Sequence, residues 1–408
     1  MYNSIVLTVF VGFLRPPVYA TLPVAAGAFM GWISWISGFP TLFFSLSVVA
    51  LAWIWAIVPS RLQAFLLFLG YFLAGASDIP IVADTFFGKG IVAGSVLWVA
   101  HASLLALPFG FLHGTRWKPL RFALALVLVS IPPLGILGWL SPLLAAGAMF
   151  PGTGLAGYAG MIVLLALAAW MPAINTTLAK RGFVVGILAM VVVADVISAS
   201  RPQPDDWFGQ NTSMGQYPEE DPSGGYERHQ ALKAMTKESI EAGAKLVLLP
   251  EGIAGEWSPV MGAIWSGVAQ LAEERGATVL IGASTLEDGV RMNSLVAIGA
   301  DTLQTHARMP MPVSMWKPWS DEGYALNMVS SGLVTVQGRE AATSICYEDL
   351  LAWPLAWSFV AGNPVAILSS GNNWFGNTSA SRIQRVSVEL QARLYGVPLI
   401  RAVNQANL

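Results

Sequence analysis

The chain has 408 residues, of which 55% are hydrophobic and only 11% are charged, and its formal net charge is −2. With a mean hydropathy of +0.59, this composition excludes an ordinary soluble protein. Residues 1–200 carry eight Lys/Arg and three acidic residues, whereas residues 201–408 carry 14 Lys/Arg and 21 acidic residues. We therefore expect a transmembrane domain over 1–200 and a water-soluble domain over 201–408. The acidic soluble half argues against nucleic acid as a partner.

Seven apolar stretches in the first half are long enough to cross a bilayer as helices. They lie near residues 17–37, 41–58, 62–83, 90–112, 121–141, 157–177 and 182–199. The stretch 3–14 is too short to span alone and is expected to be a half-span or an interfacial helix. The sequence therefore predicts seven or eight transmembrane helices.

The loops between these stretches differ sharply in charge. One set of alternate loops collects seven basic residues: Arg15, Arg61, Arg116, Lys118, Arg121, Lys180 and Arg181. The other set has only Lys89, beside Asp78 and Asp84. Because basic loops remain in the cytoplasm, the chain is expected to leave its last span on the opposite face. In a bacterium, this places a multi-pass protein in the inner membrane with residues 201–408 in the periplasm.

Few residues of the membrane half are suited to transport, and the histidines of the whole chain are not arranged for metal binding. Ionisable residues inside the membrane usually mark a transport pathway, and only His101 and Asp195 qualify. The histidines His101, His113, His229 and His306 are scattered and lack the spacing of metal ligands. We therefore expect no metal or other cofactor, and we expect the membrane domain to anchor the soluble domain rather than to transport.

Strands and helices alternate after a linker at 201–204. Helices are expected near 224–243, 258–275, 350–361 and 378–396. Strands are expected near 245–250, 277–283, 293–299, 303–309, 332–337, 342–345, 365–370 and 398–403. Helices between buried strands predict a layered α/β domain with the helices outside.

The single cysteine, Cys346, ends one predicted strand, and Glu251 directly follows another. Residues at the ends of buried strands can converge at one edge of a sheet. A thiol nucleophile and a carboxylate base require such a pairing. The alternative interpretation is a buried, inert cysteine that packs as a small hydrophobic residue.

Three short motifs carry a family resemblance. Leu-Pro-Glu at 249–251, Ile-Cys-Tyr-Glu at 345–348 and Asn-Trp-Phe-Gly at 373–376 occur in the order found in the nitrilase (carbon–nitrogen hydrolase) superfamily. With its multi-span first half, the whole chain resembles the membrane-anchored apolipoprotein N-acyltransferases. Among such proteins it is most similar to the TraB-type proteins of plasmid conjugal transfer.

The resemblance implies an αββα nitrilase-like sandwich that performs acyl transfer, or amide or ester hydrolysis, through a cysteine thioester. Glu251 would be the general base, Cys346 the nucleophile and Glu348 a supporting carboxylate. Asn373 and Trp374 would shape the pocket wall, since glycines flank them as turn residues.

The family's catalytic lysine is the point at which this sequence departs from the pattern. Arg308 falls nearest to its position, and Lys317 is the only lysine nearby. Arginine keeps the charge but cannot shuttle a proton. The cation that stabilises the oxyanion and the thiolate is therefore Arg308, Lys317 or neither.

Aromatic loops flank the proposed nucleophile in the sequence. Trp316 and Trp319 precede it, and Trp353 and Trp357 follow it. Such loops suit an acyl donor taken from the membrane lipid, although 350–360 can equally be a buried core helix. The acceptor would be a protein or another component of conjugation.

Two functions therefore remain open. The chain is either a cysteine-dependent acyltransferase or amidase, or a catalytically inactive membrane scaffold for conjugation. The missing lysine favours the scaffold, as does a C-terminus at 404–408 where relatives continue with a further strand hairpin.

Overall fold

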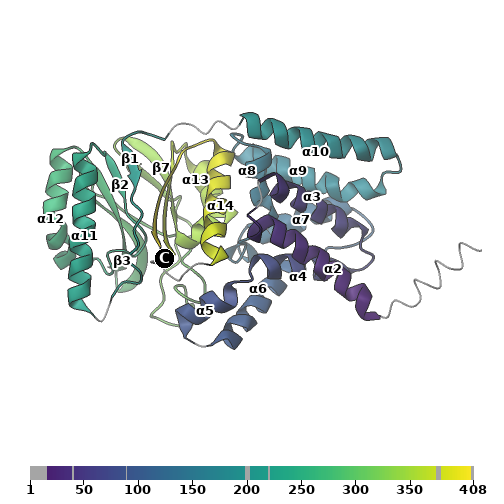
Figure 1. Cartoon of the computed structure of the whole chain (residues 1–408), viewed down its shortest axis with the longest axis horizontal. Helices are drawn as coiled ribbons and strands as arrows, with labels where there is room; N and C mark the ends of the chain where they lie inside the picture. Colours follow the sequence, from purple (N-terminus) through teal and green to yellow (C-terminus); the bar gives the residue numbers. More distant parts are fainter. Residues whose placement is uncertain are drawn as a thin grey trace, which may run out of the picture. The chain divides into compact units, whose positions relative to one another are not determined.

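The computed structural model describes residues 16–38, 41–88, 90–197, 203–218, 221–373 and 378–405, so the stretch 3–14 lies outside the described residues. The chain separates into two compact units (Figure 1). The first comprises Met1–Asp84, Lys89–Met149 and Tyr158–Asp195, and the second comprises Thr85–Gly88, Phe150–Gly157 and Val196–Leu408.

The N-terminal half is helical. Its α-helices are α2 (Pro16–Gly31), α3 (Thr41–Ile57), α4 (Arg61–Gly75), α5 (Ile79–Phe87), α6 (Ile91–Phe111), α7 (Lys118–Ser130), α8 (Ala146–Met149), α9 (Leu155–Trp170) and α10 (Thr177–Ile197). Within the described residues, three helical segments are long and apolar enough to cross a membrane: Ile91–Phe111, Leu155–Ala173 and Thr177–Ala194. Helices α4 and α5 make a fourth if the pair, bent by 49°, is taken as one span.

Two of the expected spans are not continuous helices: the one near 62–83, which is the bent pair α4 and α5, and the one near 121–141. Helix α7 ends at Ser130, and the chain then passes through Pro132 and Pro133 into 3-10 turns at Leu134–Ile136 and Pro142–Ala145. Proline lacks the N–H that a helix needs and disfavours helical backbone at the residue before it. The expectation of one span over 121–141 was therefore wrong, because hydropathy measures apolar length and not helical continuity.

Helices α2 and α4 pack with their backbones close together. A Cβ atom added at Gly27 would lie 1.8 Å from the carbonyl oxygen of Leu67, and one at Gly70 would lie 2.1 Å from that of Val24. Only glycine fits at such points. Close approach through small residues is typical of helices that associate within a membrane.

The second unit contains two sheets. The first has the order β1-β2-β3-β4-β5, in which β1 to β3 are parallel and β4 and β5 are antiparallel additions. The second has the order β6-β7-β8-β9, with β6 antiparallel to β7 and the others parallel. The strands are β1 (Trp207–Gly209), β2 (Leu246–Leu248), β3 (Thr278–Glu287), β4 (Val290–Gly299), β5 (Gln304–His306), β6 (Leu333–Val336), β7 (Arg339–Ile345), β8 (Ile367–Asn373) and β9 (Leu399–Gln405).

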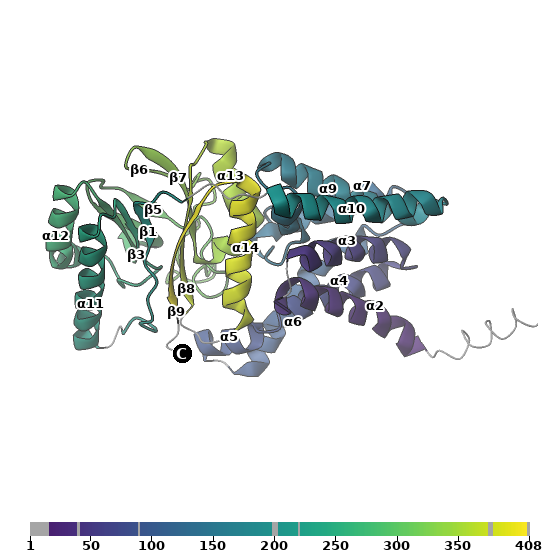
Figure 2. The same cartoon turned by 45° about the horizontal axis from the view of Figure 1, so that its top comes forward.

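Helices cover the outer face of each sheet. Figures 1 and 2 show α11 (Pro222–Glu241) and α12 (Pro259–Glu274) on the first sheet and α13 (Ala352–Ala361) and α14 (Ser379–Tyr395) on the second. A buried apolar core between the sheets includes Leu248, Leu280, Val336, Leu368 and Ile400. The layers follow the predicted helix–sheet–sheet–helix order. Each predicted helix and strand of this half has a counterpart at the expected place.

The segment after β1 links the two sheets. The Thr212 N–H donates to the carbonyl of Val403 at 3.0 Å, and the Gln405 N–H donates to the carbonyl of Thr212 at 2.8 Å. Thr212 thus pairs with the edge of β9, while β1 itself belongs to the other sheet. This pairing covers part of the edge of β9.

Candidate active site

Glu251 lies just beyond β2, where the chain turns sharply. Gly252 has a φ of +60°, which favours glycine, and a Cβ atom at Gly282 would lie 2.1 Å from the Pro250 carbonyl oxygen. These glycines let the turn pass close to β3. The Glu251 side chain is buried, and the Asn293 side chain donates from Nδ2 to Oε1 at 2.7 Å.

Cys346 lies at the junction between β7 and the 3-10 turn Cys346–Leu350. Its φ of +55° places it in the left-handed region, which costs about 1–3 kcal/mol for a residue with a side chain. The Gln384 side chain donates to the Cys346 carbonyl at 2.8 Å and holds this conformation. Strained residues of this kind cluster at functional sites.

The structure brings Glu251 and Cys346 together. The Glu251 carboxylate lies beside the Cys346 thiol and interacts with it directly, and the backbone N–H of Asn372 faces the sulfur. Burial raises the pKa of the Cys346 thiol well above its ordinary value, and the nearby Glu251 carboxylate raises it further. Burial also raises the pKa of Glu251, which the hydrogen bonds from Cys346 and Asn293 partly offset. The resting site therefore holds a neutral thiol against a carboxylate that can accept its proton.

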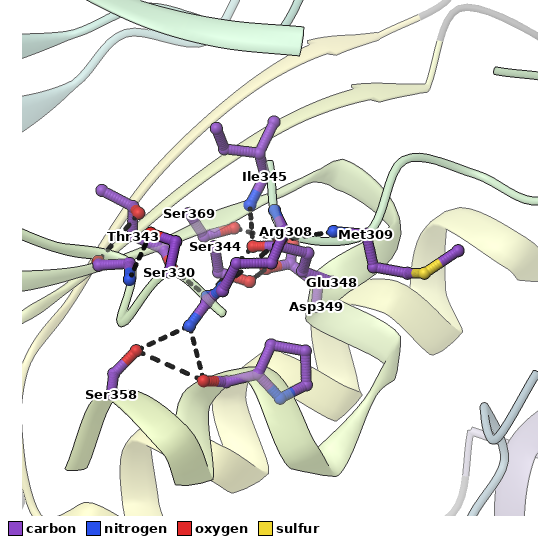
Figure 3. A network of polar contacts seen from close by, with 12 residues as sticks. Arg308, Met309, Ser330, Thr343, Ser344, Ile345, Glu348, Asp349, Ser358 and Ser369 are labelled. Carbon is purple, nitrogen blue, oxygen red and sulfur yellow. Dashed lines mark hydrogen bonds and ion pairs between the residues drawn. The ribbon is translucent and has the colours of Figure 1, made fainter. Parts of the chain in front are cut away.

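Arg308 and Glu348 form a second buried cluster (Figure 3). Both side chains are almost fully buried, with 3.0 Å between Nη2 and Oε2 and 3.3 Å between Nε and Oε1. The remaining guanidinium donors reach the carbonyls of Thr343 (2.6 Å), Pro354 (2.5 Å) and Ser331 (3.2 Å) and the Ser358 hydroxyl (2.7 Å). Every guanidinium nitrogen of Arg308 therefore has an acceptor within this cluster.

Glu348 fixes the backbone on both sides of the cluster. It accepts hydrogen bonds from the N–H groups of Arg308, Met309 (3.1 Å) and Ile345 (3.2 Å). Ile345 immediately precedes Cys346, so the Glu348 carboxylate ties the end of β7 to the loop after β5. The structure thus pairs Arg308 with Glu348, because the planar guanidinium fork matches a carboxylate.

The other expected site residues have fewer contacts. Lys317 lies half-buried in the loop between β5 and β6, and it joins none of the ion pairs within the described part of the chain. Asn373 is the buried last residue of β8. Trp374 lies outside the described residues. No group of three His, Cys, Asp or Glu side chains gathers as metal ligands in the described ranges.

Asn293 is a site residue that the sequence reasoning missed. It lies on β4 and is only 4% exposed, and its amide orients the Glu251 carboxylate. The available signal was an asparagine at the head of the apolar run Asn293–Gly299, since a buried polar side chain needs a specific partner.

Asp349 is a second buried carboxyl that the sequence reasoning missed. It accepts hydrogen bonds from the hydroxyls of Ser344 at 2.6 Å and Ser369 at 2.8 Å. Burial raises its pKa to about 7, although the charge of Arg401 and the two hydroxyls act in the opposite direction. Asp349 also raises the pKa of Cys346. The only sequence signal was a serine near the end of each of two predicted apolar strands, Ser344 and Ser369, which pair between β7 and β8.

The fold and the site together define a nitrilase-like protein. Two sheets lie between pairs of helices, Glu251 and Cys346 meet beyond β2 of one sheet and β7 of the other, and Glu348 follows the cysteine by two residues. These features match the resemblance carried by the three sequence motifs.

Comparisons with known proteins identify the family. The chain is 32% identical to the conjugal transfer protein TraB of Agrobacterium fabrum, over 96% of this chain and 93% of that protein. It is 30% identical to a probable conjugal transfer protein TraB of Sinorhizobium fredii, over 96% of this chain and 99% of that protein. The chain therefore belongs to the TraB family of conjugal transfer proteins.

Solved structures similar to the chain include nitrilase-superfamily amidases. A mutant form of an amidase from Nesterenkonia is 15% identical, with a TM-score of 0.36 over 50% of this chain and 78% of that one. Another structure of an amidase from Nesterenkonia is 15% identical, with a TM-score of 0.35 over 48% of this chain and 74% of that one. No protein-family model matches the chain.

Proposed function

We propose that this TraB-family protein is an inner-membrane enzyme that supports plasmid conjugal transfer. In this proposal the second unit performs acyl transfer, or amide or ester hydrolysis, through a thioester on Cys346. The placement of the Cys346 thiol beside the buried Glu251 carboxylate is the observation that carries the proposal.

The proposed reaction has two halves. The Cys346 sulfur attacks an acyl carbonyl carbon while its proton passes to Glu251, and a tetrahedral oxyanion forms. The C–O or C–N bond then breaks, Glu251 returns the proton to the leaving group, and a thioester remains. An acceptor amine, alcohol or water next loses its proton to Glu251, attacks the thioester and restores the thiol. Glu251 serves as the base because burial raises its pKa above the ordinary value, which makes the carboxylate a stronger proton acceptor.

Apolar segments support the proposed membrane location and the proposed lipid substrate. The candidate spans support anchoring in the inner membrane, and the charge asymmetry of the loops supports a periplasmic second unit. Trp319 and Trp357 are 67% and 46% exposed, which suits contact with a membrane lipid as acyl donor, whereas Trp353 is buried in the core. A periplasm-only reporter enzyme fused after Ser200 is expected to be active, and activity of a cytoplasm-only reporter there would contradict the topology.

Two observations favour the inactive scaffold. The guanidinium nitrogens of Arg308 all donate hydrogen bonds within the Glu348 cluster, and the pKa of Cys346 is raised rather than lowered. A scaffold of conjugation components would need neither a reactive thiol nor an acyl donor. Replacement of the cysteine separates the two functions.

Cysteine replacement in the full-length chain tests the proposal. Because Cys346 is the only cysteine, every thiol-directed label reports this site. We expect Cys346→Ala and Cys346→Ser to reach wild-type protein levels and to abolish both conjugal transfer and acylation by an activated ester. Ser266→Ala, at an exposed position of α12, is the matched control and should retain both. Normal transfer with Cys346→Ala would favour the scaffold.

A further inference from the structure

The Asn293 side-chain amide has one strong and one weak hydrogen-bond partner. Its Nδ2 atom carries two N–H groups. One donates to Glu251 Oε1 at 2.7 Å, and the other available partner is the Met315 sulfur at 4.0 Å. A thioether sulfur is a weak acceptor. The second N–H can therefore change partner at little cost.

We propose that Asn293 donates this second N–H to the oxyanion of the tetrahedral intermediate. This assignment rests on the proposed function and gives Asn293 the electrostatic role that the resemblance assigns to a lysine. The Nδ2 atom contacts the same carboxylate that contacts the Cys346 thiol. The Asn293 amide and the Cys346 thiol therefore flank one carboxylate, and an acyl carbonyl that bonds to the sulfur would form beside it.

The exchange of acceptors favours the transition state over the resting state. In the resting site the N–H faces a weakly polar sulfur, and in the transition state it faces a developing negative charge. Only an interaction that strengthens in the transition state accelerates the chemical step. Loss of one such donor in a comparable site lowers the rate by about 10²–10³-fold.

The position of Asn293 is set by the sheet. Its residue pairs with Ser284 on β3, and its carbonyl accepts a hydrogen bond from the Ala307 N–H at 2.7 Å. The side chain is 4% exposed. An amide on a rigid, buried strand pays little reorganisation when charge develops, which is the condition for effective oxyanion stabilisation.

A neutral donor also agrees with the raised pKa of Glu251. A cation beside Glu251 would stabilise its charged form and lower its pKa, which would make it a weaker base. The Asn293 amide supplies a hydrogen bond without a full charge. The site can therefore stabilise an oxyanion while Glu251 remains a useful base.

Two reactions of Cys346 separate this role from mere positioning of Glu251. Acylation by p-nitrophenyl acetate passes through an oxyanion, whereas alkylation by iodoacetamide displaces iodide and forms none. Both rates would be measured on the full-length protein in detergent for the wild type, Asn293→Ala and the isosteric Asn293→Asp. Asn363→Ala is the matched control, because Asn363 is exposed and uses only its backbone N–H in the contact with Glu340.

We expect both Asn293 variants to lower the acylation rate by about 10²–10³-fold. Alkylation should fall much less, so that the ratio of the two rates drops at least tenfold. Asn363→Ala should leave the ratio unchanged, and unfolding temperatures identify any variant that fails to fold. Equal losses of acylation and alkylation would overturn the oxyanion role while leaving the proposed function intact. A wild-type protein that is alkylated but never acylated at Cys346 would overturn the proposed function itself.

Discussion

Two buried glutamates close to Cys346 have opposite surroundings. Glu348 receives the Arg308 guanidinium and three backbone N–H groups, so its charge is fully compensated. Glu251 has an amide and a thiol as partners, and burial raises its pKa. A carboxylate held by many donors is a structural anchor. One with few donors is able to accept a proton.

The same contrast explains why the Arg308 side chain pairs with Glu348. The sequence left the cation open between Arg308, Lys317 and neither, and in this structure the Arg308 fork contacts Glu348 at two points. A buried charge needs an equally buried partner. In the proposed reaction, the site would then rely on neutral donors, namely the Asn293 amide and the Asn372 backbone N–H.

The largest expected loss of stability comes from removing the buried Arg308–Glu348 ion pair. Arg308→Met leaves the Glu348 charge buried without its partner and should lower the free energy of unfolding by about 3–5 kcal/mol. Thermal unfolding in detergent measures this loss. Adding Glu348→Gln should recover part of it, whereas Arg385→Met at a half-exposed surface pair should change stability by about 1 kcal/mol or less. Unchanged stability combined with lost acylation would make Arg308 the catalytic cation.

Changing the reactive carboxylate should affect chemistry rather than stability. Glu251→Gln keeps an oxygen for the Asn293 amide but cannot accept the thiol proton, so acylation of Cys346 should slow by about 10²–10⁴-fold. Its unfolding temperature should be equal or higher, because a buried carboxyl becomes neutral. Glu256→Gln at an exposed position is the control. Acylation at the wild-type rate in Glu251→Gln would remove the distinction between the two glutamates.

Asp349 extends the comparison to pH. Its pKa is about 7 in the folded protein and 3.8 in its ordinary state. Between these values the folded chain retains a proton that the unfolded chain has released, so this contribution is complete below pH 3.8 and declines as the pH rises toward 7. The wild type should therefore lose unfolding temperature relative to Asp349→Asn when the pH is raised from 4 to 7. A difference that does not depend on pH would contradict the assignment.

Lys317 should give the smallest effect. It belongs to none of the ion pairs seen among the described residues, and substitutions without a specific contact usually change energies by about 0.5 kcal/mol or less. Lys317→Met is therefore expected to change the acylation rate by about twofold at most. A hundredfold loss with an unchanged unfolding temperature would show that the loop brings this cation to Cys346 during the reaction.

The sequence predicted most of the second unit because its signals are local. Apolar runs such as 277–283 and the amphipathic stretch 378–396 determine a strand and a helix within short windows. The span expected over 121–141 failed where Pro132 and Pro133 outweighed hydropathy. Local signals therefore sufficed wherever no helix-breaking residue intervened.

The site was only partly predictable for the same reason. The strand pattern indicated that Glu251 and Cys346 each follow a buried strand. The expectation of one shared sheet edge was wrong, because β2 and β7 belong to different sheets, and the way the two sheets face each other depends on tertiary packing. The pairing of Arg308 with Glu348 joins residues 40 positions apart and depends on tertiary packing. Asn293 differs from any other strand asparagine only by its partner, which the sequence does not specify.

The pH dependence of Cys346 acylation tests most directly whether Glu251 is its general base. The measurement is the rate of thioester formation by the full-length protein between pH 4 and 10, followed by mass spectrometry. If Glu251 takes the proton of a neutral thiol, the rate should fall at low pH with a pKa above the ordinary value of 4.5 and should level off above that pKa. A rate that climbs until the thiol itself ionises, and does so equally in Glu251→Gln, would contradict the account.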